Sequence, residues 1–234
     1  MGFSWSLHFA QHGGEGLLSE QPRLKDSPIV NDRADAVVLS PHTLPRHYLY
    51  VDNCGILERS RARANAAIKE ASSAFSERGQ TVHDLDVIVG PVDVLGTELD
   101  FVAKRSRVSQ KRYWRVRRCL DWILKHGRIN GRALEVWLGH ATFCAMAERG
   151  VLSAFSTVYA FTAAHYWESA PLWPSVRSEL EAFRGCMVFL ESDWTRGWAD
   201  LVCATDASPA GYGVSTTQWD RANVAAVGRI DERS

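Results

Sequence analysis

The sequence predicts an α+β fold, in which short strands and amphipathic helices occupy separate stretches of the chain. Two patterns support this prediction. Apolar residues recur at helical spacing through 58–78, 109–126 and 131–149, and a glycine follows each of these ranges. Apolar runs bounded by turn residues, which are typical of strands, occupy 48–57 and 200–215.

The chain begins with a predicted helix, a loop and a short strand. Residues 4–11 are expected to begin a helix, with Ser4 as its cap. The segment 12–34 is rich in Gly, Pro, Asp and Arg, and this composition predicts a loop. A short apolar run at 36–39 is a strand candidate.

A β-hairpin is expected at 48–57. Its apolar residues flank the pair Asp52-Asn53, which suits a tight turn. Two interpretations of this turn stay open. It is an ordinary surface turn, or it holds a carboxylate out of a sheet toward metal or phosphate.

The next elements are the clearest helix of the chain and two strands. Residues 58–78 carry an apolar stripe, and Gly79 stands where a C-terminal cap belongs. Strands are predicted at 87–89 and 92–99. The stripe of the helix consists of Ala64, Ala67, Ile68, Ala71 and Phe75.

A helical block follows, and strand character returns after it, at 200–215. The strongest helix of the helical block is 109–126. Its apolar stripe consists of Tyr113, Val116, Leu120 and Ile123. Two prolines, at 171 and 174, predict a linker. The remaining helices are predicted at 131–149, 153–165 and 175–185.

Composition indicates a globular protein: of 234 residues, 46% are hydrophobic and 23% are charged. The formal net charge is zero, which gives no global signal for nucleic acid. The five cysteines are scattered, without a C-x-x-C pair, as expected of reduced thiols in an intracellular protein of the cytoplasm or nucleus. No apolar run approaches the length of a membrane span, and no secretory signal is evident.

Three further segments, Met1–Gln11, Val94–Asp100 and Thr205–Val214, accompany the hairpin run Tyr50-Val51-Asp52-Asn53. Taken in chain order, these three segments and the hairpin run resemble four parts of the reverse transcriptases of certain retrotransposons. In these retrotransposons the polymerase runs directly into ribonuclease H. These parts are a nucleotide-pocket loop and helix, the Tyr-x-Asp-Asp hairpin, a Leu-Gly strand that opens a primer-contacting hairpin, and the first two strands of ribonuclease H. An unrelated glycine-rich hairpin is the alternative for the last segment.

The resemblance implies a partial polymerase palm with hairpin and helix, a helical thumb-connection and a partial ribonuclease H-like β-hairpin. The expected boundaries are 1–100 for the palm, 101–170 for the thumb-connection, 171–199 for a linker and helix, and 200–234 for the start of ribonuclease H. The chain is expected to be a fragment truncated at both ends, because Met1 falls inside a motif that lies deep within the family's polymerase.

In the family, Mg²⁺ ions held by aspartates carry out nucleotide transfer. The resemblance places Asp52 as a catalytic metal ligand, with Asn53 at the second tip position offering a neutral oxygen. Asp206 matches the first metal-binding acid of ribonuclease H. The other acids of both sites have no match in this chain, so we expect it to be inactive alone. Gly2, Phe3, Ser4 and Gln11 match the nucleotide pocket, and a frayed terminus is the alternative.

A block of basic residues follows the Leu-Gly strand. Eight Lys or Arg and no acid lie between Phe101 and Leu120. Of these, Lys111, Arg112, Arg115 and Arg118 are expected on the face of the helix predicted at 109–126 that lies opposite its apolar stripe. Such a face suits contact with a phosphate backbone, and a plain solvated face is the alternative. The residues expected to bind nucleic acid are Lys104, Arg105, Arg107, Lys111, Arg112, Arg115 and Arg118.

Three hypotheses about function follow. The first is a fragment of a retroelement reverse transcriptase, an RNA-directed DNA polymerase with ribonuclease H that acts on an RNA–DNA hybrid or primer-template. The second is a non-catalytic nucleic-acid-binding remnant, and the third is a decayed open reading frame. No membrane partner is expected.

Overall fold

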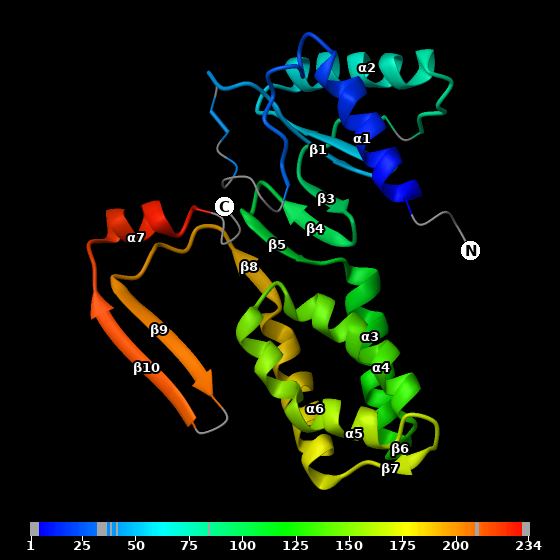
Figure 1. Cartoon of the computed structure of the whole chain (residues 1–234), viewed down its shortest axis with the longest axis vertical. Helices are drawn as coiled ribbons and strands as arrows, with labels where there is room; N and C mark the ends of the chain where they lie inside the picture. Colours follow the sequence, from blue (N-terminus) through cyan, green and yellow to red (C-terminus); the bar gives the residue numbers. More distant parts are fainter. Residues whose placement is uncertain are drawn as a thin grey trace. The chain divides into compact units, whose positions relative to one another are not determined.

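The computed structural model describes residues 5–31, 37, 39–40, 42–83, 85–208 and 211–230. The fold is mixed α+β with small antiparallel sheets, as the sequence predicts (Figure 1). The chain divides into two compact units, Met1–Val87 with Gly197–Ser234, and Ile88–Arg196. Among the described helices, none combines the length and the apolar character needed to cross a membrane.

In the first unit, two helices pack against one hairpin. Helices α1 (Ser6–Ser19) and α2 (Arg61–Glu77) contact each other and the hairpin formed by β1 (Arg46–Tyr50) and β2 (Asn53–Leu57). Predictions of the hairpin and of the helix at 58–78 are therefore confirmed. The small core between these elements consists of Leu18, Leu24, Leu49, Ala67 and Ala71.

Helix α1 is longer than predicted, so the loop predicted at 12–34 is wrong for residues 12–19. One of its three glycines is used for close packing: a Cβ atom on Gly14 would lie 2.5 Å from Cδ2 of Leu49. Tertiary contact thus outweighs the low helix propensity of glycine. The predicted cap Ser4 and part of the predicted strand at 36–39 lie outside the described residues, and neither Val37 nor Leu39 is in a strand.

The second unit contains a four-stranded antiparallel sheet in the order β3-β4-β5-β8. The segment predicted as one strand at 92–99 is a hairpin. Its turn, Leu95-Gly96, has φ angles of 53° and 84°, the pattern of a type I′ turn. Residues 87–89 form no strand, contrary to the prediction. The strands are β3 (Pro91–Val94), β4 (Thr97–Asp100), β5 (Arg105–Val108) and β8 (Glu191–Asp193).

Helix α3 (Gln110–His126) follows β5 directly, and the helix predicted at 109–126 is confirmed. Its apolar stripe is buried as expected, with Val116, Leu120 and Ile123 at most 1% exposed. The helix ends at Gly127, which adopts φ 65° and donates its N–H to Ile123 O over 2.9 Å.

The other helices of this unit close one core around α3. Trp137, Phe155 and Phe183 pack edge-on or tilted against one another, with ring centroids 4.8–6.0 Å apart. The elements are β6 (Arg128–Ile129), α4 (Gly131–Ala145), the 3₁₀ helices η1 (Arg149–Phe155) and η2 (Met187–Phe189), α5 (Ser156–Ala164), β7 (Ala170–Pro171) and α6 (Pro174–Cys186).

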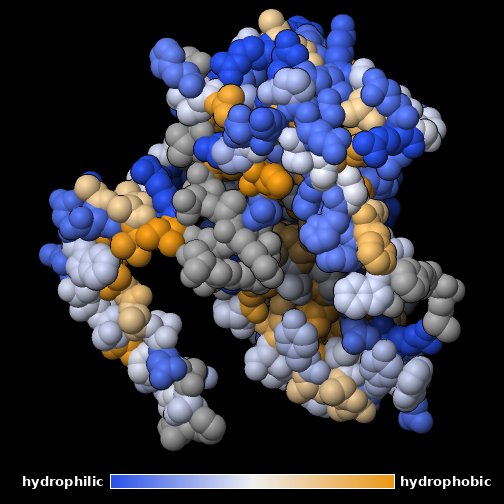
Figure 2. Space-filling view, turned by 45° about the horizontal axis from the view of Figure 1, so that its top comes forward, coloured by the Kyte–Doolittle hydropathy of each residue, from blue (hydrophilic) through white to orange (hydrophobic). Residues whose placement is uncertain are grey.

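The strand character predicted at 200–215 is confirmed by a second hairpin, β9 (Leu201–Ser208) with β10 (Gly211–Gln218), followed by α7 (Arg221–Val227). Its apolar side chains are largely exposed, Tyr212 at 90% and Val214 at 68%. Figure 2 shows orange, apolar residues at the surface of this hairpin and α7.

Candidate functional site

The tip of the β1–β2 hairpin is strained. Tyr50 pairs with Asn53, so the two turn residues are Val51 and Asp52, one position earlier than predicted. Val51 has φ 56°, a left-handed conformation that β-branched residues rarely adopt. A positive φ at the first turn residue alone is the pattern of a type II′ turn, which favours glycine there.

Gln11 of α1 holds this turn in place. Its Oε1 accepts a hydrogen bond from the Val51 N–H at 2.9 Å, and its Nε2 donates to Leu49 O at 2.8 Å. Nε2 also donates to Glu15 Oε1 at 2.7 Å, so Glu15 orients the amide. Gln11 was predicted to line a nucleotide pocket; in the structure its side chain is bonded to the hairpin backbone. The other predicted pocket residues, Gly2, Phe3 and Ser4, lie outside the described residues.

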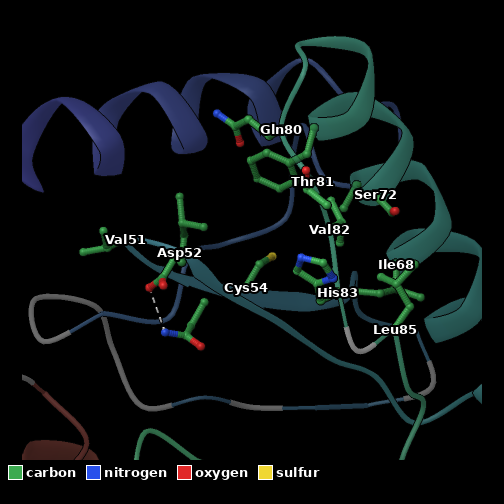
Figure 3. Close-up of a pocket in the computed structure, with 14 residues that line it drawn as sticks. Val51, Asp52, Cys54, Ile68, Ser72, Gln80, Thr81, Val82, His83 and Leu85 are labelled. Carbon is green, nitrogen blue, oxygen red and sulfur yellow. Dashed lines mark hydrogen bonds between the residues drawn. The ribbon is translucent and has the colours of Figure 1, made fainter.

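Asp52 stands exposed at the tip, beside Asn53 (Figure 3). Asn53 Nδ2 donates a hydrogen bond to Asp52 Oδ1 over 3.0 Å, and the side-chain carbonyl oxygen of Asn53 takes no part in this bond. Strained backbone persists where the surrounding structure fixes it and is concentrated at functional sites. The hairpin therefore presents one carboxylate in a fixed position.

A cleft of about 520 Å³ adjoins this carboxylate. It lies between the hairpin, α2 and the segment after α2, and Figure 3 shows Asp52 at one end of it and His83 farther along. Burial raises the pKa of the Cys54 thiol in its wall to about 11, so this cysteine is protonated at neutral pH and is a poor nucleophile. The polar lining also includes Asn53, Ser72, Gln80 and Thr81.

The donors at this site do not suffice for a pair of metal ions. Two-metal catalysis requires several carboxylates around ions a few ångströms apart. In the described part of the chain, no group of three His, Cys, Asp or Glu side chains could hold a metal ion. Asp52 supplies one carboxylate, so the residues present fit a single ligand of such a site and not the whole site.

Asp206 lies in the middle of β9, where it is exposed and paired in register with Gly213. No metal-binding cluster forms around it among the described residues. The match to a first ribonuclease H acid therefore remains a prediction about one residue.

The structure divides the seven predicted nucleic-acid-binding residues into two groups. Arg107 forms an ion pair with Glu98 at 2.6 Å, and Arg105 lies 3.5 Å from Glu191. Arg112 lies 4.0 Å from the centroid of the Phe143 ring and packs over the turn at Gly96. These three arginines are engaged within the fold, so the prediction that Arg112 faces solvent with the others is wrong.

The second group points to solvent. Lys104, Lys111, Arg115 and Arg118 are exposed and form no ion pair with a described residue. The last three lie on the outer face of α3, opposite the buried stripe, and Lys125 joins them one turn beyond Trp122. We call the exposed residues Lys111, Trp114, Arg115, Arg118, Trp122 and Lys125 the α3 outer face.

Sequence reasoning missed two features of these sites. The strain at Val51 could have been suspected, because a valine precedes Asp52 where glycine is usual. The exposure of Trp114 and Trp122 could have been predicted from their positions opposite the apolar stripe of the helix at 109–126.

No family model matches the chain, and neither a curated protein nor a solved structure matches it.

Proposed function

We propose that this chain is part of a retroelement reverse transcriptase, an RNA-directed DNA polymerase with ribonuclease H, and that it holds the primer-template. The observation that carries the proposal is the tip of the β1–β2 hairpin. Val51 is kept in a strained conformation by Gln11, and this fixes Asp52 in solvent beside a cleft. An ordinary surface turn would not need such a clamp.

The α3 outer face supports the proposal that the chain holds the primer-template. Four cations there, Lys111, Arg115, Arg118 and Lys125, are exposed on one side of a helix that packs firmly on its other side. A rigid row of like charges suits neutralisation of successive phosphates of a nucleic-acid strand without reading its sequence.

Mg²⁺ belongs to the proposal as the ion that Asp52 would bind. When bound there, the ion would supply positive charge that offsets the negative charge developing on phosphate during nucleotide transfer. Because no group of three metal-binding side chains forms among the described residues, the 234-residue chain alone is expected to hold nucleic acid without extending a primer. This observation also favours a second candidate, a non-catalytic nucleic-acid-binding protein.

Binding of an RNA template annealed to a DNA primer tests the proposal. The triple variant Lys111→Glu, Arg115→Glu and Arg118→Glu should bind at least about tenfold more weakly in fluorescence anisotropy. The matched control reverses three exposed cations of the first unit, Lys25, Arg61 and Lys69, and should bind like the wild type.

One result would contradict the proposed role of the α3 outer face, and another would contradict only the expectation that the chain is inactive alone. Equal loss of binding in both triple variants would mean that only net charge matters. Template-dependent primer extension by the chain in Mg²⁺, abolished by Asp52→Ala, would show that it carries a complete catalytic site.

A further inference from the structure

Two tryptophans lie on the α3 outer face, where they are not part of the protein core. Trp114 and Trp122 are each 51% exposed, although α3 buries a full apolar stripe on its opposite side. They are eight residues apart, so they lie on the same side of the helix, separated by about 12 Å along its axis. Arg118 lies midway between them, four residues from each.

Each indole is held by a neighbouring ring. The Tyr113 ring meets Trp114 edge-on, with centroids 5.2 Å apart and an interplanar angle of 86°. The His126 ring stacks on Trp122 at 4.1 Å and 26°, and its Nδ1 lies 2.8 Å from Trp122 O. A stacked neighbour restrains the ring and leaves its other face for a ligand.

A hollow of about 500 Å³ adjoins Trp114. Its lining combines Tyr113 and Trp114 with Arg117 and Arg118, so an aromatic wall stands next to cationic groups. The one acid there, Asp121, lies 3.2 Å from Arg117 and 2.7 Å from Arg184, and these ion pairs neutralise it.

We infer that the α3 outer face binds single-stranded nucleic acid, with unpaired bases stacked on Trp114 and Trp122 and the intervening phosphates on Arg118 and its cationic neighbours. The inference rests on the proposed role of α3 in holding phosphates. It adds that the part of the ligand lying on this face must offer base faces: the duplex of a primer-template keeps these inside its stack, whereas the unpaired template beyond the primer exposes them. All unpaired charges on this face are cationic, which favours a polyanion over a protein with a mixed surface.

Stacking uses features that RNA and DNA bases share, so both kinds of strand should bind. Binding should be tolerant of sequence, since every base has a π-face and no donor or acceptor on this face is argued to read base edges.

The experiment measures binding of the full chain to labelled oligo(dT) and oligo(U) of about 12 nucleotides, and to an abasic strand of equal length and charge. Trp114→Ala and Trp122→Ala should each weaken binding to the normal strands by about five- to hundredfold and leave binding to the abasic strand unchanged. Trp114→Phe, which keeps an aromatic face, should restore most of the affinity.

Trp167→Ala is the matched control, because this tryptophan is 75% exposed in the same unit but far along the sequence from α3. It should bind like the wild type. If normal and abasic strands bind the wild type equally, or if the Trp114 and Trp122 variants bind normally, the stacking inference is overturned while phosphate binding stands. If the wild type binds none of the single strands but still binds the annealed primer-template, the inference fails and the proposed function stands; if it binds neither, both fail.

Discussion

Two glycines of helix α4 are predicted to have opposite effects on stability when replaced by alanine, because only one of them lies against the end of α5. Gly131 is the first residue of α4, and a Cβ atom there would lie 2.1 Å from Thr162 O and 2.8 Å from Tyr166 Cα. Both are backbone atoms and cannot move aside as a flexible side chain could. Gly139 lies exposed within the same helix, with nothing within 4 Å of its would-be Cβ.

Gly131→Ala should therefore destabilise the protein and Gly139→Ala should stabilise it. Overpacking of this kind costs about 1–3 kcal/mol of unfolding free energy. Replacing an exposed mid-helix glycine gains about 0.5–1 kcal/mol. In a chain of 234 residues, each kcal/mol corresponds to a shift of about 2–4 °C in the unfolding temperature.

Thermal unfolding of the full chain, followed by circular dichroism at 222 nm, measures both shifts. The two single variants have the same change of side chain in the same helix, so each is the control for the other. If Gly131→Ala unfolds at the wild-type temperature or above, α4 does not approach α5 as closely as described, and the packing that supports α3 is wrong.

Three further predictions concern single residues. His47 is buried, and desolvation lowers its pKa below 6.5, with Glu15 partly opposing this. The unfolded chain therefore takes up the proton first, and the unfolding free energy should fall as pH drops through 6.5. Urea unfolding over this pH range should show a weaker fall in His47→Gln. Val51→Gly should raise the unfolding free energy by about 1 kcal/mol because it removes the strain at φ 56°, and an unchanged urea midpoint would argue against strain. Cys144 is buried with a pKa raised to about 11, so a maleimide should label it only after unfolding, whereas exposed Cys203 should react in the native state.

Local signals in the sequence predicted α3 and the β1–β2 and β9–β10 hairpins, but the hairpin of β3 and β4 was predicted as a single strand. The stripe of α3 and Gly127 at its end are both properties of adjacent residues, and they were sufficient to place the helix within one residue. The turn of the β1–β2 hairpin was misplaced by one position, because Asp-Asn is a better turn pair than Val-Asp by propensity. Gln11, forty residues earlier in the chain, offsets that preference through its bond to Val51.

Features that depend on distant residues could not be predicted. Helix α1 continues through glycines because Gly14 packs against Leu49. The basic block contains no acid in sequence, yet Arg105 lies near Glu191 and Arg107 pairs with Glu98 across strands. A run of charges therefore overstates the cations available to a ligand until the fold shows which are paired.

The salt dependence of primer-template binding tests the central claim most directly, because it counts the phosphates that the α3 outer face neutralises. With Lys111, Arg115, Arg118 and Lys125 engaged, log K should fall against log salt with a slope of about −3 to −4. Arg115→Gln with Arg118→Gln should make the slope shallower by about 2. A slope that is unchanged in this double variant would place the contact elsewhere and contradict the account.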